Sequence, residues 1–76
     1  MKRADITRNK IISSAISLFN TQGYRATSLS DITRSTGLTK GAIYGNFQNK
    51  DAVAVAAFEY AVEKVLSDLR IRIRKS

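Results

Sequence analysis

Residues 27–47 read TSLSDITRSTGLTKGAIYGNF and contain the features that decide the fold. Ser28 is followed three residues later by Asp31, the spacing of a capping box, with Asp in place of the usual Glu. Gly37 is suited to end that helix, because glycine adopts the left-handed backbone conformation without steric cost. Thr39 can cap a second short helix by accepting a bond from a free amide. The stretch therefore predicts two short helices joined by a tight turn.

The glycines at positions 37, 41 and 45 recur every four residues, and three explanations compete for them. A phosphate-binding loop needs Gly-x-x-x-x-Gly-Lys-Ser/Thr or Gly-x-Gly-x-x-Gly directly after a strand, whereas this spacing differs and a helix precedes it. A membrane-pairing stripe needs an apolar host of about 20 residues, and this run contains Thr, Lys and Asn. A helix-turn-helix remains: Gly37 lets two helices cross, and Gly41 lets the second helix approach a ligand closely.

A longer amphipathic segment precedes this stretch. Residues 6–22 place apolar side chains at helical spacing, which predicts a first helix. Two residues are placed to cap its start: Asp5 and Thr7. Gly23 is expected to end the helix, with Tyr24 folding back onto Phe19, the apolar contact that accompanies such an ending.

A fourth helix is predicted after Asn49, which is placed to cap it. Its apolar side chains fall on one side: Val55, Phe58, Val62, Val65, Leu66, Leu69 and Ile73. The sequence has no proline, and its best strand-like pattern is only RIRIR at 70–74. We therefore expect an all-α fold, a homeodomain-like three-helix domain followed by the start of a long fourth helix.

Composition argues against catalysis. The 76-residue chain has room for one small domain and contains neither Cys nor His, which removes thiolate metal sites, the commonest general base and the commonest metal ligand. Its six carboxylates are scattered singly. We expect no enzyme activity, no metal and no cofactor. No apolar run suited to a signal peptide or a membrane span is visible, so a cytoplasmic location without membrane contact is expected.

The charge balance indicates a polyanionic partner. Thirteen basic and six acidic residues give a net charge of +7. Residues 1–50 carry eight basic and two acidic side chains, whereas residues 51–76 carry five and four. A basic domain of this kind is typical of binding to nucleic acid or to an anionic membrane.

The predicted second short helix matches the DNA major groove in size. From Lys40 to Phe47 it spans about 12 Å at 1.5 Å per residue, and the groove is about 12 Å wide. Ile43 and Phe47 lie four residues apart and anchor its inner side. The second helix of a helix-turn-helix enters the major groove, so double-stranded DNA is the expected partner.

Four sequence pieces occur in order: Phe-x-x-x-Gly-Tyr, Thr-Ser-x-x-Asp-Ile, Gly-Leu-Thr-Lys-Gly-x-x-Tyr-x-x-Phe and Asn-Lys-Asp. Together they resemble the DNA-binding domain of the tetracycline-repressor (TetR/AcrR-type) family of bacterial transcriptional regulators. The resemblance covers residues 5–64, with the helix-turn-helix at about 29–48. It implies a homodimer that reads a palindromic operator, most often a repressor released by a small-molecule inducer. It also implies that residues 65–76 lead toward a C-terminal regulatory domain that lies outside this chain.

Ten residues are expected to contact DNA: Thr27, Ser28, Thr39, Lys40, Gly41, Ala42, Tyr44, Gly45, Asn46 and Lys50. Among the base contacts, Lys40 suits guanine, Asn46 suits adenine and Ala42 suits a thymine methyl group, although the first two can also meet a phosphate. Lys50 is assigned to a phosphate, and Tyr44 is similar to the family tyrosine that hydrogen-bonds one. The charged, polar and aromatic members of this set also have a purely structural interpretation, as a helix cap, a packing residue, a polar helix end or a solvated charge.

This sequence departs from the family pattern at three positions. Gly45 stands where similar members often carry an aromatic residue or His, so only its backbone can contact DNA. Thr33 and Thr36 stand where Ala is frequent, and their hydroxyls need hydrogen-bond partners or partial exposure.

The N-terminal basic residues Lys2, Arg3 and Arg8 are expected either to form an arm on the DNA or to be a basic tail.

The predicted core consists of Ile32, Leu38, Ile43, Phe47 and Phe58.

An alternative function is a small helical interaction or dimerisation module with non-specific affinity for nucleic acid. Its docking surface would be the fourth-helix stripe of Val62, Val65, Leu66, Leu69 and Ile73. An RNA-binding domain is a further alternative, although the aromatic platform typical of single-strand binding is missing from the sequence.

Overall fold

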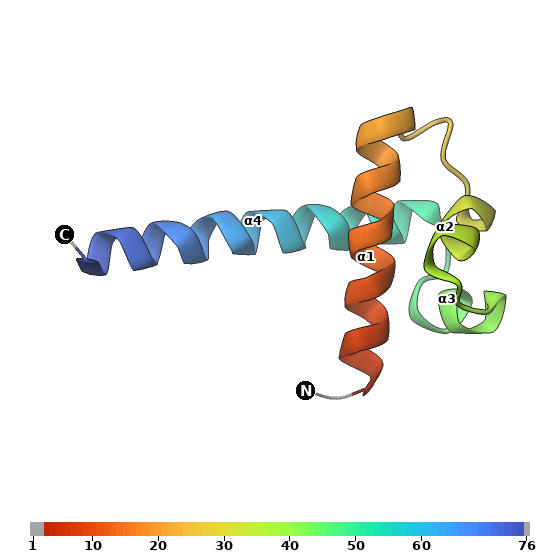
Figure 1. Cartoon of the computed structure of the whole chain (residues 1–76), viewed down its shortest axis with the longest axis horizontal. Helices are drawn as coiled ribbons and strands as arrows, with labels where there is room; N and C mark the ends of the chain where they lie inside the picture. The colour runs from red at the N-terminus through yellow and green to blue at the C-terminus, as the bar shows by residue number, and fades with distance from the viewer. Residues whose placement is uncertain (1–2, 76) are drawn as a thin grey trace.

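The computed structural model describes residues 3–75, which form four helices and no strand. The helices are α1 (Arg3–Gln22), α2 (Leu29–Thr36), α3 (Lys40–Asn46) and α4 (Lys50–Lys75). Figure 1 shows α1 crossing the first half of α4, with α2 and α3 side by side next to this crossing. The second half of α4 projects away from the other helices. The predicted all-α fold is confirmed. Over residues 3–75, each helix is too short or too polar to cross a lipid bilayer.

The core lies where α1 meets the other three helices. Its buried side chains are Ile11, Ile12, Ala15, Ile32, Ile43, Phe47, Val53, Ala56 and Ala57. Leu29 and Leu38 pack against this cluster while remaining partly exposed. Of the five residues predicted as core, Ile32, Ile43 and Phe47 are buried and Leu38 lies at the edge. Each helix contributes to a single cluster, which fixes the position of α3.

The prediction for Phe58 is wrong, because its side chain is 71% exposed. The first half of α4 has two apolar stripes, and α1 packs on the one formed by Val53, Ala56 and Ala57. Alanines let the two helix backbones approach closely, whereas Phe58 lies on a different side of α4 together with Val55. The smaller side chains therefore face the core.

The predicted caps of the three later helices are confirmed. At the start of α2, the Asp31 amide donates to the Ser28 hydroxyl (3.0 Å) and the Ser28 amide donates to the Asp31 carboxylate (2.9 Å). Thr39 Oγ1 accepts from the Ala42 amide at the start of α3 (3.1 Å). Asn49 Oδ1 likewise accepts from the first turn of α4. These side chains satisfy amides that have no partner within the helix.

The start of α1 differs from the prediction. The helix begins at Arg3 rather than near residue 6, and Asp5 lies inside its first turn. Neither Asp5 nor Thr7 is therefore the cap. An acidic residue within the first turn is still favourable, because the helix dipole places positive charge there.

The end of α1 is built as predicted. Gly23 has a φ of 87°, and its amide donates to the carbonyl of Phe19 (3.1 Å). The next residue, Tyr24, places its ring centroid 5.2 Å from that of Phe19. The left-handed glycine turns the chain back toward the core and directs it into the loop before α2.

The hydroxyls of Thr33 and Thr36 have partners inside the domain. Thr33 Oγ1 donates to the carbonyl of Leu29 (2.8 Å). Thr36 Oγ1 donates to the carbonyl of Thr33 (3.1 Å) and accepts from the amide of Leu38 (3.2 Å). Among the described residues, no buried side-chain nitrogen or oxygen lacks a partner. Threonine at these two positions is therefore compatible with the fold.

Candidate nucleic-acid interface

A left-handed glycine joins α2 to α3. Gly37 has φ 73° and ψ 7°, and its amide donates to the carbonyl of Thr33 (3.0 Å). Thr36 holds the amide of Leu38 just after this turn. Two short helices thus follow each other at a sharp angle, with Leu38 packed against the core between them. This is the predicted helix-turn-helix arrangement.

The helix α3 buries one side and exposes the other. Ile43 is fully buried, and Phe47, which ends the helix, is 4% exposed. Tyr44 is 55% exposed, so part of its side chain is accessible from outside the domain. Lys40, Gly41 and Gly45 are also exposed. The outer side of α3 is therefore free to meet a ligand.

The three glycines have different surroundings. A Cβ atom at Gly45 would meet nothing within 4 Å, and one at Gly41 would meet only Thr39 Oγ1 at 3.8 Å. Neither position needs glycine for packing or for a left-handed backbone, in contrast to Gly37. The outer surface of α3 consequently has no side chain at Gly41 and Gly45, so the backbone of a ligand can approach the helix closely there.

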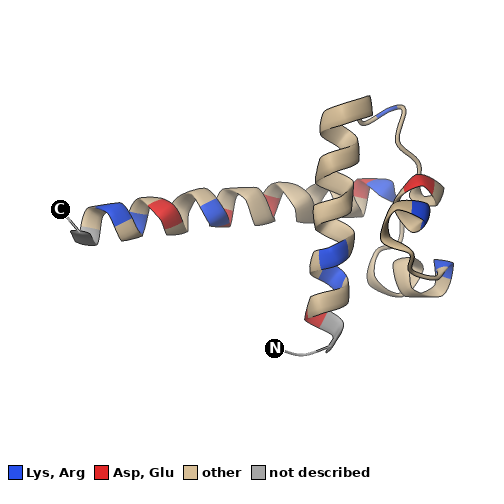
Figure 2. Ribbon diagram, viewed as in Figure 1, with Lys and Arg blue, Asp and Glu red and all other residues tan. Residues whose placement is uncertain are grey.

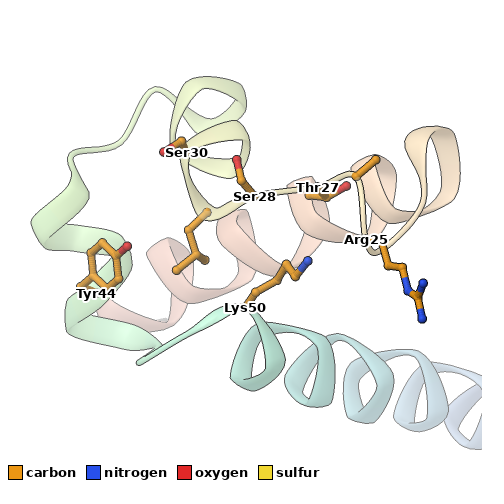
Figure 3. A pocket seen from close by; sticks show the side chains of 8 residues that line it. Arg25, Thr27, Ser28, Ser30, Tyr44 and Lys50 are labelled. Atoms are coloured by element: carbon orange, nitrogen blue, oxygen red, sulfur yellow. The ribbon is translucent and has the colours of Figure 1, made fainter.

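A cleft of about 470 Å³ lies between α3, the start of α2 and the start of α4. Figure 3 shows Lys50 extending from α4 toward the loop before α2, with Tyr44 at one end of the cleft and Arg25 at the other. Ser28 and Ser30 add hydroxyl groups to its wall. Two cations and four hydroxyl-bearing side chains, including Thr27, line this open cleft. Such a set suits an anionic oxygen ligand such as a phosphate.

Lys50 is held in place by the loop between α1 and α2. Its Nζ donates to the carbonyl of Tyr24 (2.9 Å) and lies 4.2 Å from the centroid of the Tyr24 ring. The hydroxyl of Tyr24 in turn donates to the carboxylate of Asp51. The ammonium group therefore has a defined position at the cleft.

Thr27 and Ser28, predicted together, differ in position. Thr27 is 1% exposed, and its hydroxyl donates to the carbonyl of Gly23 (2.8 Å) within the domain. Ser28 is exposed, and its hydroxyl oxygen accepts the cap bond while its proton can still be donated outward. The Thr27 side chain thus supports the loop, and Ser28 faces the cleft.

Electrostatics at the start of α2 keep Asp31 ionised. The hydrogen bond from the Ser28 amide, helped by the Ser28 hydroxyl and the nearby Arg34, lowers the pKa of Asp31 below its ordinary value. Arg34 forms an ion pair with this carboxylate. The carboxylate of Asp31 thus interacts with the Ser28 amide at the start of α2 and with the guanidinium of Arg34.

Two other predicted contacts already have partners. Asn46 is half-buried, and its side-chain nitrogen donates to the carbonyl of Ala42 (2.8 Å), which leaves its side-chain oxygen for a ligand. The guanidinium of Arg8 lies 4.7 Å from the ring centroid of Phe47. Lys2 and the side chain of Arg3 lie outside what the structure describes.

Arg25 and Ser30 also line the cleft and are not among the predicted residues. Their signal was available: Arg25 precedes the capping box by three residues, and Ser30 lies within it, between Ser28 and Asp31. Figure 2 shows basic residues on each element around the cleft, with acidic residues on α2 and at the start of α4. Along the projecting half of α4, charges of both signs occur as far as Asp68, and only basic residues follow it. Basic residues therefore lie both around the cleft and toward the C-terminal end of α4.

A sharp glycine turn between two short helices, the second exposed beside a basic cleft, defines a helix-turn-helix domain of the DNA-binding class. The family model described as bacterial regulatory proteins, tetR family, matches residues 11–57. The chain belongs to this family and carries the DNA-binding part of a transcription regulator.

Similar proteins agree with this assignment. The crystal structure of a TetR-family transcriptional regulator from Cytophaga hutchinsonii is 49% identical, with a TM-score of 0.77, and covers 97% of this chain and 37% of that chain. The uncharacterized HTH-type transcriptional regulator YerO of Bacillus subtilis is 32% identical over 83% of this chain and 22% of its own length. The HTH-type transcriptional regulator AcrR of Shigella flexneri is 43% identical over 64% of this chain and 23% of its own length.

A third relative carries a regulatory direction in its name. The Staphylococcus epidermidis protein IcaR, named as a negative transcriptional regulator of the biofilm operon icaADBC, is 39% identical over 60% of this chain and 25% of its own length. The present chain spans about a quarter of the length of these curated relatives.

Proposed function

We propose that this chain binds a specific double-stranded operator, with α3 in the major groove and the cleft on the adjacent phosphates. The observation that carries the proposal is the exposed outer side of α3 next to a cleft with Lys50 and Arg25 at its wall. Phosphate contacts set the position of such a domain, and contacts to base edges set its sequence preference. The domain acts by binding rather than by catalysis.

The contacts divide between bases and phosphates. Lys40, Ala42 and the oxygen of Asn46 meet base edges, because they lie on α3 without being buried. Tyr44 and Lys50, which both line the cleft, meet phosphates. The hydroxyls of Ser28 and Thr39 add hydrogen bonds there, while Gly41 and Gly45 let the α3 backbone approach. Thr27 contributes through its loop rather than through its buried hydroxyl.

The DNA-binding domain, residues 5–64, is proposed to be part of a larger cytoplasmic regulator. Residues 65–76 would continue α4 toward a C-terminal domain that binds a small-molecule inducer, and two copies would read the two halves of a palindrome. Support comes from the TetR-family structure, of which this chain covers only 37%. A repressor is favoured because IcaR is named as a negative regulator.

The test is a salt titration with the 76-residue chain. A duplex selected from a random pool is compared with unselected DNA, and log K is measured against log salt. We expect a clear preference for the selected duplex and a linear salt dependence with a slope of about −0.9 per phosphate contacted. Equal affinity for both duplexes at every salt concentration would exclude a sequence-specific domain.

Two lysine variants separate contact from general charge. Lys50→Ala is expected to weaken binding to all sequences alike and to reduce the salt slope by about one unit. Lys64→Ala removes the same charge from an exposed position on α4, remote from the cleft, and is expected to leave the slope unchanged. An equal loss of slope in both variants would contradict the assignment of Lys50.

An interaction module is the second candidate, favoured by the apolar surface of α4. Phe58, Val62 and Val65 are exposed there, and with Ala61 and Leu66 they line a shallow apolar hollow. Such a patch is typical of a surface that another helix covers. If association alone is the function, self-association measured by ultracentrifugation will persist in Lys40→Ala and Tyr44→Ala, and no duplex will be preferred.

A further inference from the structure

Tyr24 lies in the loop between α1 and α2 and is outside the set of cleft-lining residues. Its ring has a fixed position, because Gly23 ends α1 in the left-handed conformation and the ring packs against Phe19 at 5.2 Å. The ring therefore remains at the edge of the domain, next to the first turn of α4.

Tyr24 contacts two successive residues of α4 with two different groups. Its carbonyl accepts a hydrogen bond from Lys50 Nζ (2.9 Å), and its ring lies 4.2 Å from the same nitrogen. Its hydroxyl donates to the carboxylate of Asp51. The first two contacts act on the ammonium itself, whereas the third ties the ring to the backbone segment that carries Lys50.

A lysine side chain is flexible, so contacts such as those from Tyr24 are needed to keep its ammonium group at one position. Its ammonium sits on a flexible four-carbon stem and loses rotational freedom when it binds a phosphate. The Tyr24 carbonyl uses one of its three N–H donors, which leaves two for a ligand. The attraction between the cation and the ring holds the group without using a donor. Much of the ordering of Lys50 has thus already occurred in the free protein.

We propose that Tyr24 is a positioning residue for DNA binding: it holds the ammonium of Lys50 at the cleft, where that group meets a backbone phosphate. The inference rests on the proposed function, since it requires Lys50 to contact DNA. Tyr24 itself makes no contact with the phosphate. Its effect on affinity passes through Lys50, and this distinguishes it from a residue that only stabilises the loop.

The test is a double-mutant cycle on affinity for the selected duplex. Tyr24→Leu removes the ring and is expected to weaken binding about fivefold, the equivalent of ordering one long side chain on binding. In a Lys50→Ala background, the same substitution is expected to have no further effect. Tyr24→Phe keeps the ring and loses only the bond to Asp51, so its affinity is expected to stay within twofold of the unmodified chain.

Folding is monitored so that a loss of affinity can be distinguished from a loss of the folded structure. Circular dichroism melts identify any variant that is not folded, and Tyr24→Met then replaces Tyr24→Leu, because it keeps an apolar contact with Phe19 without a ring. In the free protein, nuclear magnetic resonance is expected to show ring-current shifts of the Lys50 ε-protons. These shifts should persist in Tyr24→Phe and disappear in Tyr24→Leu.

Three results would overturn the inference. The first is an equal loss of affinity from Tyr24→Leu in both backgrounds, which indicates a purely structural role. The second is unchanged affinity in Tyr24→Leu and Tyr24→Met while Lys50→Ala weakens binding. Both leave the proposed function intact. The third is a failure of the unmodified chain to prefer or bind any duplex, which removes the proposed function and this inference together.

Discussion

The guanidinium of Arg8 on α1 lies 4.7 Å from the ring centroid of Phe47, the residue that ends α3. Phe47 is buried, and its amide donates to the carbonyl of Ile43 (2.9 Å) at the end of α3. Arg8 therefore contacts the end of α3 that packs against the core. For Arg8, the sequence alone predicts either an arm on the DNA or a basic tail. Its position against Phe47 gives it a supporting role within the domain.

We expect Arg8→Ala to reduce the free energy of unfolding by about 0.5–1 kcal/mol, the usual contribution of a cation near an aromatic ring. Urea unfolding followed by circular dichroism measures the change. Lys10→Ala removes an exposed charge from the same helix and serves as the control, with an expected change within about 0.5 kcal/mol. Equal effects of the two substitutions would show that the contact with Phe47 contributes nothing to stability.

Gly37 and Gly45 provide a matched pair of glycine substitutions. Gly37→Ala is expected to destabilise the domain by about 1–2 kcal/mol, because its φ of 73° is unfavourable for a residue with a Cβ atom. Gly45→Ala is expected to stabilise it by about 0.5–1 kcal/mol, because this helical position is open and alanine is the better helix former. Thermal melts of both variants test the pair. The prediction fails if Gly37→Ala is tolerated as well as Gly45→Ala.

Stability should depend on pH through Asp31. Its pKa is lowered in the folded state by the Ser28 amide, the Ser28 hydroxyl and Arg34. A lowered pKa means that the ionised form stabilises the fold, so the contribution is present above the unfolded pKa of about 4. It is lost as the pH falls through the lower folded value. Melting temperatures of the unmodified chain and of Asp31→Asn should therefore differ at pH 7 and converge near about pH 2.

Asp68→Asn is the control for the change in net charge, because it removes one negative charge as Asp31→Asn does. Asp68 is exposed on the projecting half of α4, away from the start of α2. A difference between the unmodified chain and Asp31→Asn that stays constant over the whole pH range would show that the carboxylate acts only as an uncharged acceptor.

Lys40 is expected to carry sequence preference. Lys40→Ala should weaken binding to the selected duplex by about 1–3 kcal/mol and relax the preference at one base pair, as removal of a direct guanine contact does. Binding to a panel of single-base variants of the duplex measures this change. A loss of equal size on every duplex, with a lower salt slope, would assign Lys40 to a phosphate instead.

Short-range features of the fold were predictable from the sequence. The bonds of Ser28 with Asp31 and of Thr39 with Ala42 each join residues three apart. The left-handed turn at Gly37 depends on one residue and its missing Cβ atom. Such features follow from local backbone geometry, which neighbouring residues determine. They were sufficient to predict two short helices, the turn and the class of the domain.

Features that depend on distant contacts were not predictable. Phe58 was expected in the core, but α1 packs on the alanine side of α4, and only the fit between two helix surfaces makes that choice. The burial of Thr27 depends on how the loop folds against α1, since its hydroxyl reaches carbonyls there and at Gly23. Periodicity states which residues share a face and leaves open which face is covered.

The sequence by itself determined the helix caps, the glycine turn and the family of this protein, because each depends on short motifs of residues close together in the chain. Only the tertiary structure decided that Tyr24 holds Lys50 at the cleft, across 26 residues of sequence, and that Arg8 lies behind Phe47. Side chains this far apart meet only after the helices pack around a common core. The position of each cation relative to the cleft is therefore a property of the folded domain.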